Sequence, residues 1–280
     1  MQKIGLIGHG FVGSALAAVF CSKYIIQVYD TRKLDLKTPN TVQTSLQNLM
    51  KTEIIFICVP TPSLENGACD LSIVESVLNQ LIGYDGIVVV KSTLLPSTLD
   101  STLKLVFNPE FLTEKNAVND FKNAARILIG GKPEYTSKVA AVYLKLGYNP
   151  DIIFQNDNLD TFALVKYMSN SFLASKVALF NEYYNTCKKH GIPFDTVRRY
   201  MVLDKRIGAS HTQVPGPDGQ FGFSGHCFPK DTEALLYEFP DMTILSSIVE
   251  ANKKFILKTI DNECFQSKTI STVEKDGDKK

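Results

Sequence analysis

A cysteine placed just before an expected helix is the residue best suited to chemistry in this sequence. Residues 221–231 read Phe-Gly-Phe-Ser-Gly-His-Cys-Phe-Pro-Lys-Asp, and the proline stands where a helix takes its first turn. A thiol at a helix N-terminus faces the positive end of the backbone dipole and unpaired amide N–H groups, which lower its pKa. Cys227 is therefore a candidate nucleophile. The alternative is a buried cysteine that packs as a small hydrophobic residue.

A glycine-rich turn near the N-terminus has the pattern of a dinucleotide site. An apolar run over residues 4–7 precedes it, and a helix rich in small residues is expected after it. The turn consists of Gly8, His9, Gly10, Phe11, Val12 and Gly13. In this context the first glycine permits a tight turn, the second lets a pyrophosphate approach the backbone, and the third lets the helix pack closely on the sheet. The phosphates are expected at the helix N-terminus.

The second expected strand, residues 25–30, ends on an acid. Asp30 lies 17 positions after Gly13. An acid at this place can bind both ribose hydroxyls and repels a 2′-phosphate, which favours NAD over NADP. Arg32 and Lys33 follow closely and weaken that preference.

Two helical pairs of polar residues could take part in catalysis. If the segment after Pro109 is helical, Glu110 and Glu114 lie one turn apart on the same face, although paired glutamates are more often solvated surface. Lys166 and Asn170 are four residues apart on a long helix expected over residues 160–190. The alternative for the lysine is that it reaches solvent along an apolar helix.

The remaining elements indicate an α/β fold. Apolar strands are expected at residues 54–59, 87–90, 105–107 and 126–130, the last of these being the last strand of the first domain, with helices over residues 72–81 and 132–145 between and after them. This alternation predicts a Rossmann-type, doubly wound parallel sheet. Ligands of such sheets bind beyond the strand C-termini, where Thr61 and Thr93 are expected. Ordinary strand capping is the alternative for both threonines.

Length and composition favour two domains that handle small molecules. The chain has 280 residues, and its 30 basic and 29 acidic side chains nearly cancel, which does not favour nucleic acid or an anionic membrane as a partner. We expect an NAD-binding domain over residues 1–158, a mostly helical second domain over 159–268 that begins with the long helix, and a disordered tail over 269–280. No signal peptide, paired cysteine spacing or membrane-spanning apolar run is evident, so we expect a reducing, cytoplasmic location.

Seven motifs together resemble the UDP-glucose and GDP-mannose dehydrogenase family, whose members oxidise a nucleotide sugar twice at C6 to give a uronic acid. They occur in the family order between residues 8 and 231. The motifs are Gly8-x-Gly10-x-x-Gly13, Val59-Pro60-Thr61-Pro62, Lys91-Ser92-Thr93, Asn108-Pro109-Glu110-Phe111-Leu112-x-Glu114, Lys166-x-x-x-Asn170, Arg206-Ile207-Gly208 and Gly225-x-Cys227-Phe228-x-Lys230-Asp231.

The resemblance implies a mechanism that passes through the cysteine. Removal of a hydride from the primary alcohol gives an aldehyde, which Cys227 traps as a thiohemiacetal. A second NAD accepts another hydride, leaving a thioester that water hydrolyses. By similarity, Lys166 and Asn170 stabilise the developing oxyanions. Glu110 is then the base for the hydrolytic water.

The resemblance also implies the binding residues. Asp231 with Thr93 is expected to hold a water and assist proton transfer. The expected cofactor residues are those of the glycine-rich turn together with Asp30, Val59, Pro60, Thr61, Glu114 and Lys230. The expected substrate residues are Phe111, Leu112, Arg206, Phe221, Gly222, Phe223 and Gly225. In the family Arg206 reaches the sugar of the neighbouring subunit, so we expect a homodimer formed through the long helix. No metal is expected.

This sequence departs from the family pattern in three places. The turn after Thr93 is altered, and the loop over residues 211–219 is longer and richer in proline, with Ser224 replacing a glycine. In the family a third domain holds much of the nucleotide base, and these 280 residues do not include it. We therefore expect either that a loop or a partner compensates, or that the substrate lacks that nucleotide.

The leading hypothesis is an NAD-dependent nucleotide-sugar 6-dehydrogenase with UDP-glucose as substrate, which would supply a polysaccharide precursor. One alternative is a two-electron β-hydroxyacid dehydrogenase, a related architecture that has no need of Cys227. The other is a non-catalytic relative that binds NAD or a nucleotide as a regulator or assembly partner.

Overall fold

The computed structural model describes residues 1–95, 99 and 102–257. Their backbone contacts divide the chain into two compact units. The first contains residues 1–62 and 69–166, and the second contains residues 63–68 together with the chain from Tyr167 onward. The division falls inside a long helix, between Lys166 and Tyr167, whereas the predicted domain boundary at 158/159 lies before that helix. The predicted tail over residues 269–280 lies outside the described residues.

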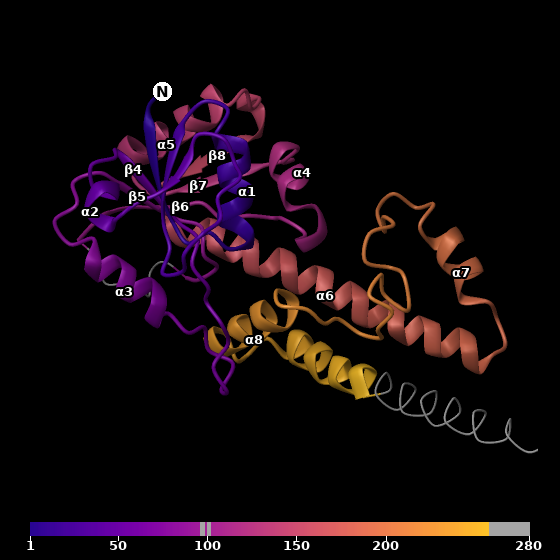
Figure 1. The fold of residues 1–280 in the computed structure, drawn as a ribbon. Coiled ribbons are helices and arrows are strands. Elements are labelled where there is room, and N and C mark those ends of the chain that lie inside the picture. Colours follow the sequence, from indigo (N-terminus) through magenta and orange to yellow (C-terminus); the bar gives the residue numbers. More distant parts are fainter. Residues whose placement is uncertain (96–98, 100–101, 258–280) are drawn as a thin grey trace, which may run out of the picture. The chain divides into compact units, whose positions relative to one another are not determined.

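The first unit is built on an eight-stranded sheet with the order β3-β2-β1-β4-β5-β6-β7-β8 (Figure 1). Neighbouring strands are parallel except for β6 and β7, which are antiparallel. From β3 to β6 this is the Rossmann order, which confirms the predicted fold class. The strands are β1 (Lys3–Ile7), β2 (Ile25–Tyr29), β3 (Thr41–Gln43), β4 (Ile54–Ile57), β5 (Ile87–Val90), β6 (Lys104–Phe107), β7 (Ile127–Gly130) and β8 (Ile153–Asn156).

The central strands are buried on both faces, which explains their continuous apolar sequences. Successive side chains point to opposite faces, so Ile54 and Phe56 join one core cluster while Ile55 and Ile57 join the other. The first cluster includes residues of α1 (Phe11–Phe20), α4 (Ala117–Lys122) and α5 (Pro133–Lys145). The second includes residues of α2 (Leu46–Leu49), α3 (Ser72–Gln80) and the first turns of α6 (Leu159–Lys189). Helices therefore cover both faces, as a doubly wound sheet requires.

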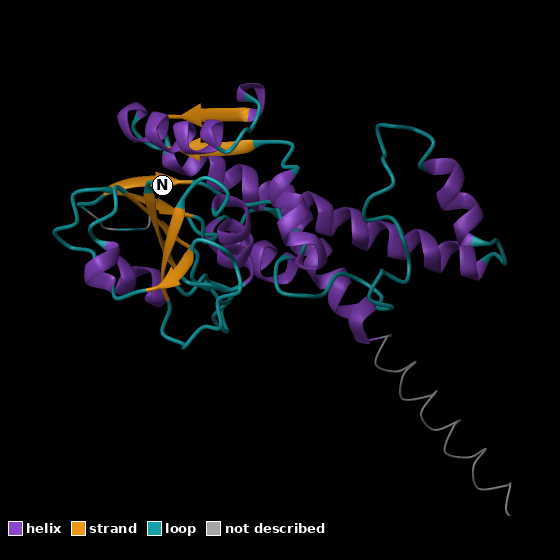
Figure 2. Ribbon diagram, turned by 45° about the horizontal axis from the view of Figure 1, so that its top comes forward, coloured by secondary structure: helices purple, strands orange, loops and turns teal. Residues whose placement is uncertain are grey.

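In the described residues, the second unit consists of helices and the loops that connect them, and Figure 2 shows these helices. It contains the greater part of α6, then α7 (Phe194–Met201), α8 (Phe228–Glu238) and a last helical stretch over residues 243–257. One core cluster joins α6 to the segment before α8 and to the last helix through Ala174, Ala178, Phe223 and Phe255. None of the helices in the described part of the chain is both long and apolar enough to span a membrane.

Two predictions about local structure are wrong. Residues 108–113 carry no helix, and Glu114 begins a short 3-10 helix, Glu114–Asn116. Glu110 and Glu114 therefore do not lie one turn apart on a helical face. The segment at 127–130 is also not the last strand of its unit, because β8 follows it after α5 and a second 3-10 helix, Pro150–Ile152. β8 lies at the edge of the sheet, pairs only with β7, and has two of its four residues exposed. Its sequence therefore lacks the continuous apolar run that made the central strands recognisable.

Candidate active site

The glycine-rich turn links the end of β1 to the start of α1. Gly8 has a φ of +86°, and a Cβ there would lie 2.5 Å from the carbonyl oxygen of Cys58. A Cβ on Gly13 would lie 2.1 Å from the carbonyl oxygen of Gly8, so neither position accepts a side chain. At Gly10 a Cβ would meet nothing within 4 Å, and no side chain caps the helix there. The first N–H groups of α1 therefore remain available for an anion such as a phosphate.

A cleft of about 770 Å³ opens beside this turn. It lies beyond the carboxyl ends of β1 and β4, where the strand order reverses and where ligands of such sheets bind. Its lining includes seven of the predicted cofactor residues: Gly8, Gly10, Phe11, Val12, Asp30, Val59 and Pro60. The shape and the glycines fit a dinucleotide. The buried Nε2 atom of His9 has no hydrogen-bond partner in the described structure, which leaves one polar atom of the turn unsatisfied.

Asp30 is held in place by the glycine-rich turn and by Arg32. Its Oδ2 accepts a hydrogen bond of 2.8 Å from the backbone N–H of His9, and its Oδ1 pairs with Nε of Arg32 at 3.0 Å. The hydrogen bond from the Arg32 side chain is the main cause that holds the pKa of Asp30 below its usual value. Asp30 is therefore an anion throughout the neutral pH range. Arg32, which the sequence predicts to weaken an NAD preference, forms an ion pair with this acid.

Thr61 and Thr93 lie beyond the ends of β4 and β5, as predicted. The hydroxyl of Thr61 donates a hydrogen bond of 3.0 Å to the carbonyl oxygen of Thr93. The hydroxyl of the intervening Ser92 donates one of 2.7 Å to the carbonyl oxygen of Val59. These two hydrogen bonds tie together the segments that follow β4 and β5, and neither of them uses the hydroxyl of Thr93.

Glu110 forms a buried ion pair with Lys166. The Nζ atom of the lysine lies 3.1 Å from Oε1 of Glu110 and donates a hydrogen bond of 2.7 Å to its carbonyl oxygen. Their side chains are 4% and 8% exposed, so the Lys166 ammonium does not extend to solvent as the alternative interpretation held. Oε2 of Glu110 accepts a hydrogen bond of 2.6 Å from the N–H of Leu112. The loop conformation, and not a helix, places the carboxylate on the lysine.

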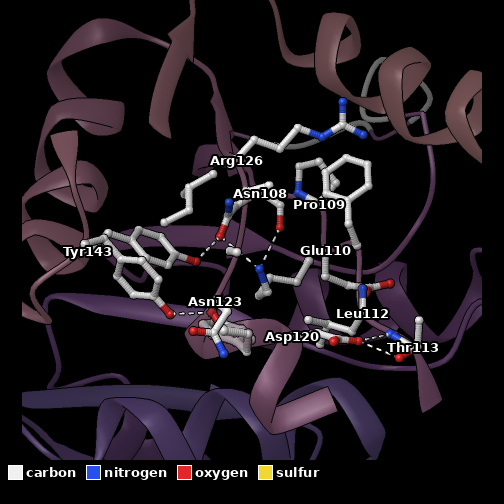
Figure 3. Close-up of a pocket in the computed structure, with 16 residues that line it drawn as sticks. Asn108, Pro109, Glu110, Leu112, Thr113, Asp120, Asn123, Arg126 and Tyr143 are labelled. Atoms are coloured by element: carbon white, nitrogen blue, oxygen red, sulfur yellow. Dashed lines mark hydrogen bonds between the residues drawn. The ribbon is translucent and has the colours of Figure 1, made fainter. Parts of the chain in front are cut away.

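The substrate residues predicted on this loop lie beside the ion pair. The Phe111 ring has the guanidinium of Arg126 4.1 Å and the ammonium of Lys166 5.3 Å from its centroid. Leu112 and Phe111 are half-buried and line a second cavity of about 550 Å³ (Figure 3). Glu114 starts the 3-10 helix that follows.

In the second unit, Cys227 occupies the N-cap of α8, as the sequence predicts. Its carbonyl oxygen accepts a hydrogen bond of 2.9 Å from the N–H of Asp231, one turn later. The Asp231 carboxylate is 1% exposed, and it accepts hydrogen bonds from the Asn170 amide and from Lys230 Nζ, the latter at 2.6 Å. Asp231 is therefore an acceptor fixed by an amide and an ammonium in the turn that follows the thiol.

Two asparagines that the sequence interpretation missed hold the segment before Cys227. Asn181 on α6 accepts a hydrogen bond of 3.0 Å from the N–H of Gly222. Asn252 accepts one of 2.7 Å from the N–H of Phe223 and donates one of 2.9 Å to its carbonyl oxygen. Gly222 has a φ of +74°, and a Cβ there would lie 2.4 Å from Oδ1 of Asn252. Most residues three or four positions from these asparagines are apolar, such as Val177 and Ala178 near Asn181 and Ile248 and Phe255 near Asn252. That pattern was the signal available in the sequence.

The remaining predicted substrate residues lie in the same unit. Phe221 and Phe223 are packed into its core clusters, while Gly225 is exposed. The side chain of Arg206 is 90% exposed and pairs with Asp204 at 2.6 Å. Its backbone is fixed nearby, because Lys176 of α6 donates to the carbonyl oxygens of Ile207 at 2.8 Å and Gly208 at 2.9 Å. Lys176 was not singled out from the sequence.

The unusual loop over residues 211–219 is ordered internally. Ser224, which departs from the family glycine, donates a hydrogen bond of 2.9 Å from its hydroxyl to Oδ2 of Asp218. The N–H of Gly216 donates one of 2.8 Å to the carbonyl oxygen of Gln220. The altered turn after Thr93 includes residues outside the described part of the chain.

The predicted site residues fall into two groups. The first unit holds the glycine-rich turn, Asp30, the two threonines, Glu110 and Lys166. The second unit holds Asn170, Cys227, Lys230, Asp231 and the segment over 221–225. Helix α6 runs through both units and carries Lys166 and Asn170 one turn apart.

Comparison with known proteins gives matches in both units. Residues 27–146 match the NAD binding domain, and residues 161–255 the central domain, of the UDP-glucose/GDP-mannose dehydrogenase family. The UDP-glucose 6-dehydrogenase of Rickettsia bellii is 36% identical over 259 residues, which cover 83% of this chain and 58% of that protein. The chain thus spans a little over half the length of that relative.

Solved structures show the same fold. A UDP-glucose dehydrogenase from the hyperthermophilic archaeon Pyrobaculum islandicum aligns with a TM-score of 0.78 at 27% identity, covering 91% of this chain and 68% of that one. The 3-hydroxyisobutyrate dehydrogenase of Mycobacterium tuberculosis aligns with a TM-score of 0.71 at 14% identity, over 92% of this chain and 95% of that one. At that identity the second likeness concerns the fold alone.

Proposed function

Because this chain belongs to the UDP-glucose/GDP-mannose dehydrogenase family, we propose that it catalyses the NAD-dependent four-electron oxidation of a nucleotide sugar. UDP-glucose is the proposed substrate and UDP-glucuronate the product, on the strength of its similarity to UDP-glucose 6-dehydrogenases. The observation that carries the proposal is the position of Cys227 at the first turn of α8, one turn before the fixed carboxylate of Asp231. A two-electron dehydrogenase has no use for such a thiol.

The cleft beside the glycine-rich turn is the proposed NAD site. The open backbone at Gly10 and the N–H groups of α1 would hold the diphosphate, and Asp30 would bind the adenosine ribose hydroxyls. NAD, when bound, accepts the hydride in each oxidation step. The proposal assigns further cofactor contacts to Thr61, Glu114 and Lys230.

The thiol of Cys227 retains the substrate between the two oxidations. The first oxidation removes a hydride from C6 and a proton from its hydroxyl, which gives an aldehyde. The sulfur then adds to the aldehyde carbon, the carbonyl oxygen takes up a proton, and a thiohemiacetal results. Loss of a second hydride and of the hydroxyl proton gives a thioester. Water attacks this thioester, the carbon–sulfur bond breaks, and the carboxylate and the thiol are released.

Polar side chains around these steps have distinct proposed roles. Lys166 and Asn170 donate hydrogen bonds to the oxygen that becomes negative in the addition and hydrolysis steps. Glu110 takes the proton from the hydrolytic water, while Asp231 with Thr93 orients a water and transfers protons. The buried hydrogen bonds of Glu110 and Asp231 support these assignments, because they fix each carboxylate in one orientation.

The proposed substrate contacts come from two loops and from a second subunit. Phe111, Leu112 and the segment over 221–225 would surround the sugar, and Arg206 would reach the sugar bound to the neighbouring subunit. Exposed apolar residues on α6 support a homodimer through this helix: Met168, Phe172 and Leu179 are 51%, 68% and 44% exposed.

The stoichiometry of NADH tests the proposal. The purified chain is incubated with a limiting amount of UDP-glucose, or of other nucleotide sugars, and excess NAD. Two NADH per sugar are expected, with no turnover in Cys227→Ser and normal turnover in the control Cys21→Ser, which changes a half-buried thiol at the end of α1. One NADH per sugar, or turnover that survives Cys227→Ser, would refute the four-electron reaction and favour the two-electron alternative. Ligand binding without turnover would favour the non-catalytic one.

A further inference from the structure

Lys91 is a buried lysine to which the proposed mechanism gives no role. It directly follows β5, it is 3% exposed, and its N–H continues the strand pairing by donating to the carbonyl oxygen of Ile57 at 2.9 Å. In the described residues no carboxylate oxygen lies within 4 Å of its ammonium. Burial lowers its pKa to about 8. Among the described residues, the Lys91 ammonium is therefore a buried cation without an ion-pair partner.

The contacts of this ammonium converge on one residue. Nζ of Lys91 donates hydrogen bonds of 3.0 Å both to the carbonyl oxygen and to Oδ1 of Asn108 (Figure 3). The hydroxyl of Tyr143, on α5, donates to the same Oδ1, and Nδ2 of Asn108 donates to the carbonyl oxygen of Leu128 at 2.7 Å. Asn108 is 1% exposed. Its orientation is therefore determined from three sides, by β5, α5 and β7.

Asn108 is the first residue of the loop that carries the proposed base. Glu110 follows two residues later, and its carboxylate binds Lys166 at 3.1 Å and the N–H of Leu112 at 2.6 Å. The loop is thus held at Asn108 by Lys91 and at Glu110 by Lys166. A displacement of Asn108 would move the backbone that sets the position of the Glu110 carboxylate.

Lys91 also separates two cavities. It lines the cleft of about 770 Å³ proposed for the cofactor and the cavity of about 550 Å³ behind the Glu110 loop, and it is the one residue common to both linings. Its side chain therefore connects the wall of the cofactor site to the loop of the proposed base.

A charge in this place is costly for stability. Replacing buried charged groups by well-packed apolar residues of similar volume is often neutral or stabilising, so the stability of the sheet does not explain the lysine. Residues that break the ordinary rules of burial concentrate at functional sites, and the loop of the proposed base Glu110 lies beside this lysine. The ammonium supplies two strong hydrogen-bond donors, one to each oxygen of Asn108. A methionine supplies none.

We propose that Lys91 is a positioning residue, whose ammonium fixes Asn108 and thereby holds the Glu110 loop in the conformation that the hydrolytic step requires. This inference rests on the proposed function only in that Glu110 acts as the base. The positioning itself is a property of the folded chain and can be measured without turnover.

The test compares Lys91→Met with Lys104→Met, the same substitution at an exposed lysine of the neighbouring strand that pairs with Asp85. Amide hydrogen exchange is followed in peptides that cover residues 108–113. In Lys91→Met we expect exchange of these amides to rise about tenfold, because a buried hydrogen-bonded polar group loses its partner. We expect kcat to fall about a hundredfold, the effect of a small misplacement of a reacting group. Lys104→Met should leave both the exchange and kcat unchanged.

Two further variants keep the inference falsifiable. Lys91→Arg retains the charge and the donors, and should recover part of the loop protection and of kcat. Tyr143→Phe removes one donor to Asn108, whereas Lys91→Met removes two hydrogen bonds, so it should loosen the same peptides to a smaller extent even if Lys91→Met does not fold. Unchanged exchange over residues 108–113 in the folded variants would overturn the positioning role. Failure of the wild-type chain to oxidise any nucleotide sugar, with the exchange changes still observed, would overturn the proposed function and leave Lys91 as the residue that orders this loop.

Discussion

Nζ of Lys166 lies 3.1 Å from Oε1 and 2.7 Å from the carbonyl oxygen of Glu110, and both side chains are almost fully buried. The lysine therefore binds the glutamate through its side chain and through its backbone. In the proposed reaction, oxyanion stabilisation and water activation come from these two residues. Their pairing means that neither group can be altered without affecting the other.

Removal of the lysine from this pair should destabilise the fold strongly. Lys166→Met leaves the Glu110 carboxylate buried without its cation, a change that costs about 3 kcal/mol or more. The free energy of unfolding, measured by urea denaturation at neutral pH, should fall by that amount. Lys189→Met, at the exposed end of the same helix, is the control and should change it by less than about 0.5 kcal/mol. Equal effects of the two substitutions would show that the pair contributes no special stability.

The Asn181 amide should be needed for the geometry of the cysteine segment. Asn181→Ala leaves the N–H of the buried Gly222 without its acceptor, which costs about 1–3 kcal/mol of unfolding free energy. We also expect kcat for NADH formation to fall, because this segment leads into Cys227. Asn185→Ala, one turn further along α6 and half-buried, is the matched control. If both variants retain wild-type stability and kcat, the hydrogen bond to Gly222 does not position the segment.

The acid at the end of β2 should determine the choice of dinucleotide. Asp30→Ala removes the negative charge from the cleft and releases Arg32 to bind a 2′-phosphate. The ratio of Kd values for NADP and NAD, measured by titration of each dinucleotide, should fall at least about tenfold. Asp35→Ala, an exposed acid in the loop that follows β2, should leave the ratio unchanged. An unaltered ratio in Asp30→Ala would place the discrimination elsewhere.

Lys91 should make stability rise with pH in the alkaline range. Burial lowers its pKa from 10.5 to about 8, so between these values the unfolded chain binds the proton and the folded chain does not. Stability therefore increases with pH across this window, and the burial penalty applies in full below pH 8. The unfolding free energy of the wild type minus that of Lys91→Met should rise by about 2 kcal/mol between pH 8 and pH 10. The subtraction cancels the tyrosines and cysteines common to both proteins. A difference independent of pH would contradict the burial of a charged lysine.

The sequence by itself determined the features whose cause is local. The glycines at 8 and 13 are required by contacts within one turn and its neighbouring strand, and the apolar runs of β1, β4 and β5 follow from burial on both faces of a sheet. The placement of Cys227 at a helix start followed from the proline two residues later. The glycine spacing, the apolar runs and the proline after Cys227 can each be recognised within a short stretch of the chain, so residue types and spacing suffice to predict these features.

Tertiary structure alone decided how the polar side chains are bonded. Glu110 meets Lys166 across 56 positions, and Lys91 meets Asn108 across 17. Asn252 reaches back 29 positions to Phe223. The periodicity of the sequence does not predict such contacts, because they form only when strands and helices far apart in the chain pack together. The same holds for the antiparallel β7 and for the loop that replaced the expected helix at Glu110: hydrogen-bond partners from other elements outweighed the local preference of the chain.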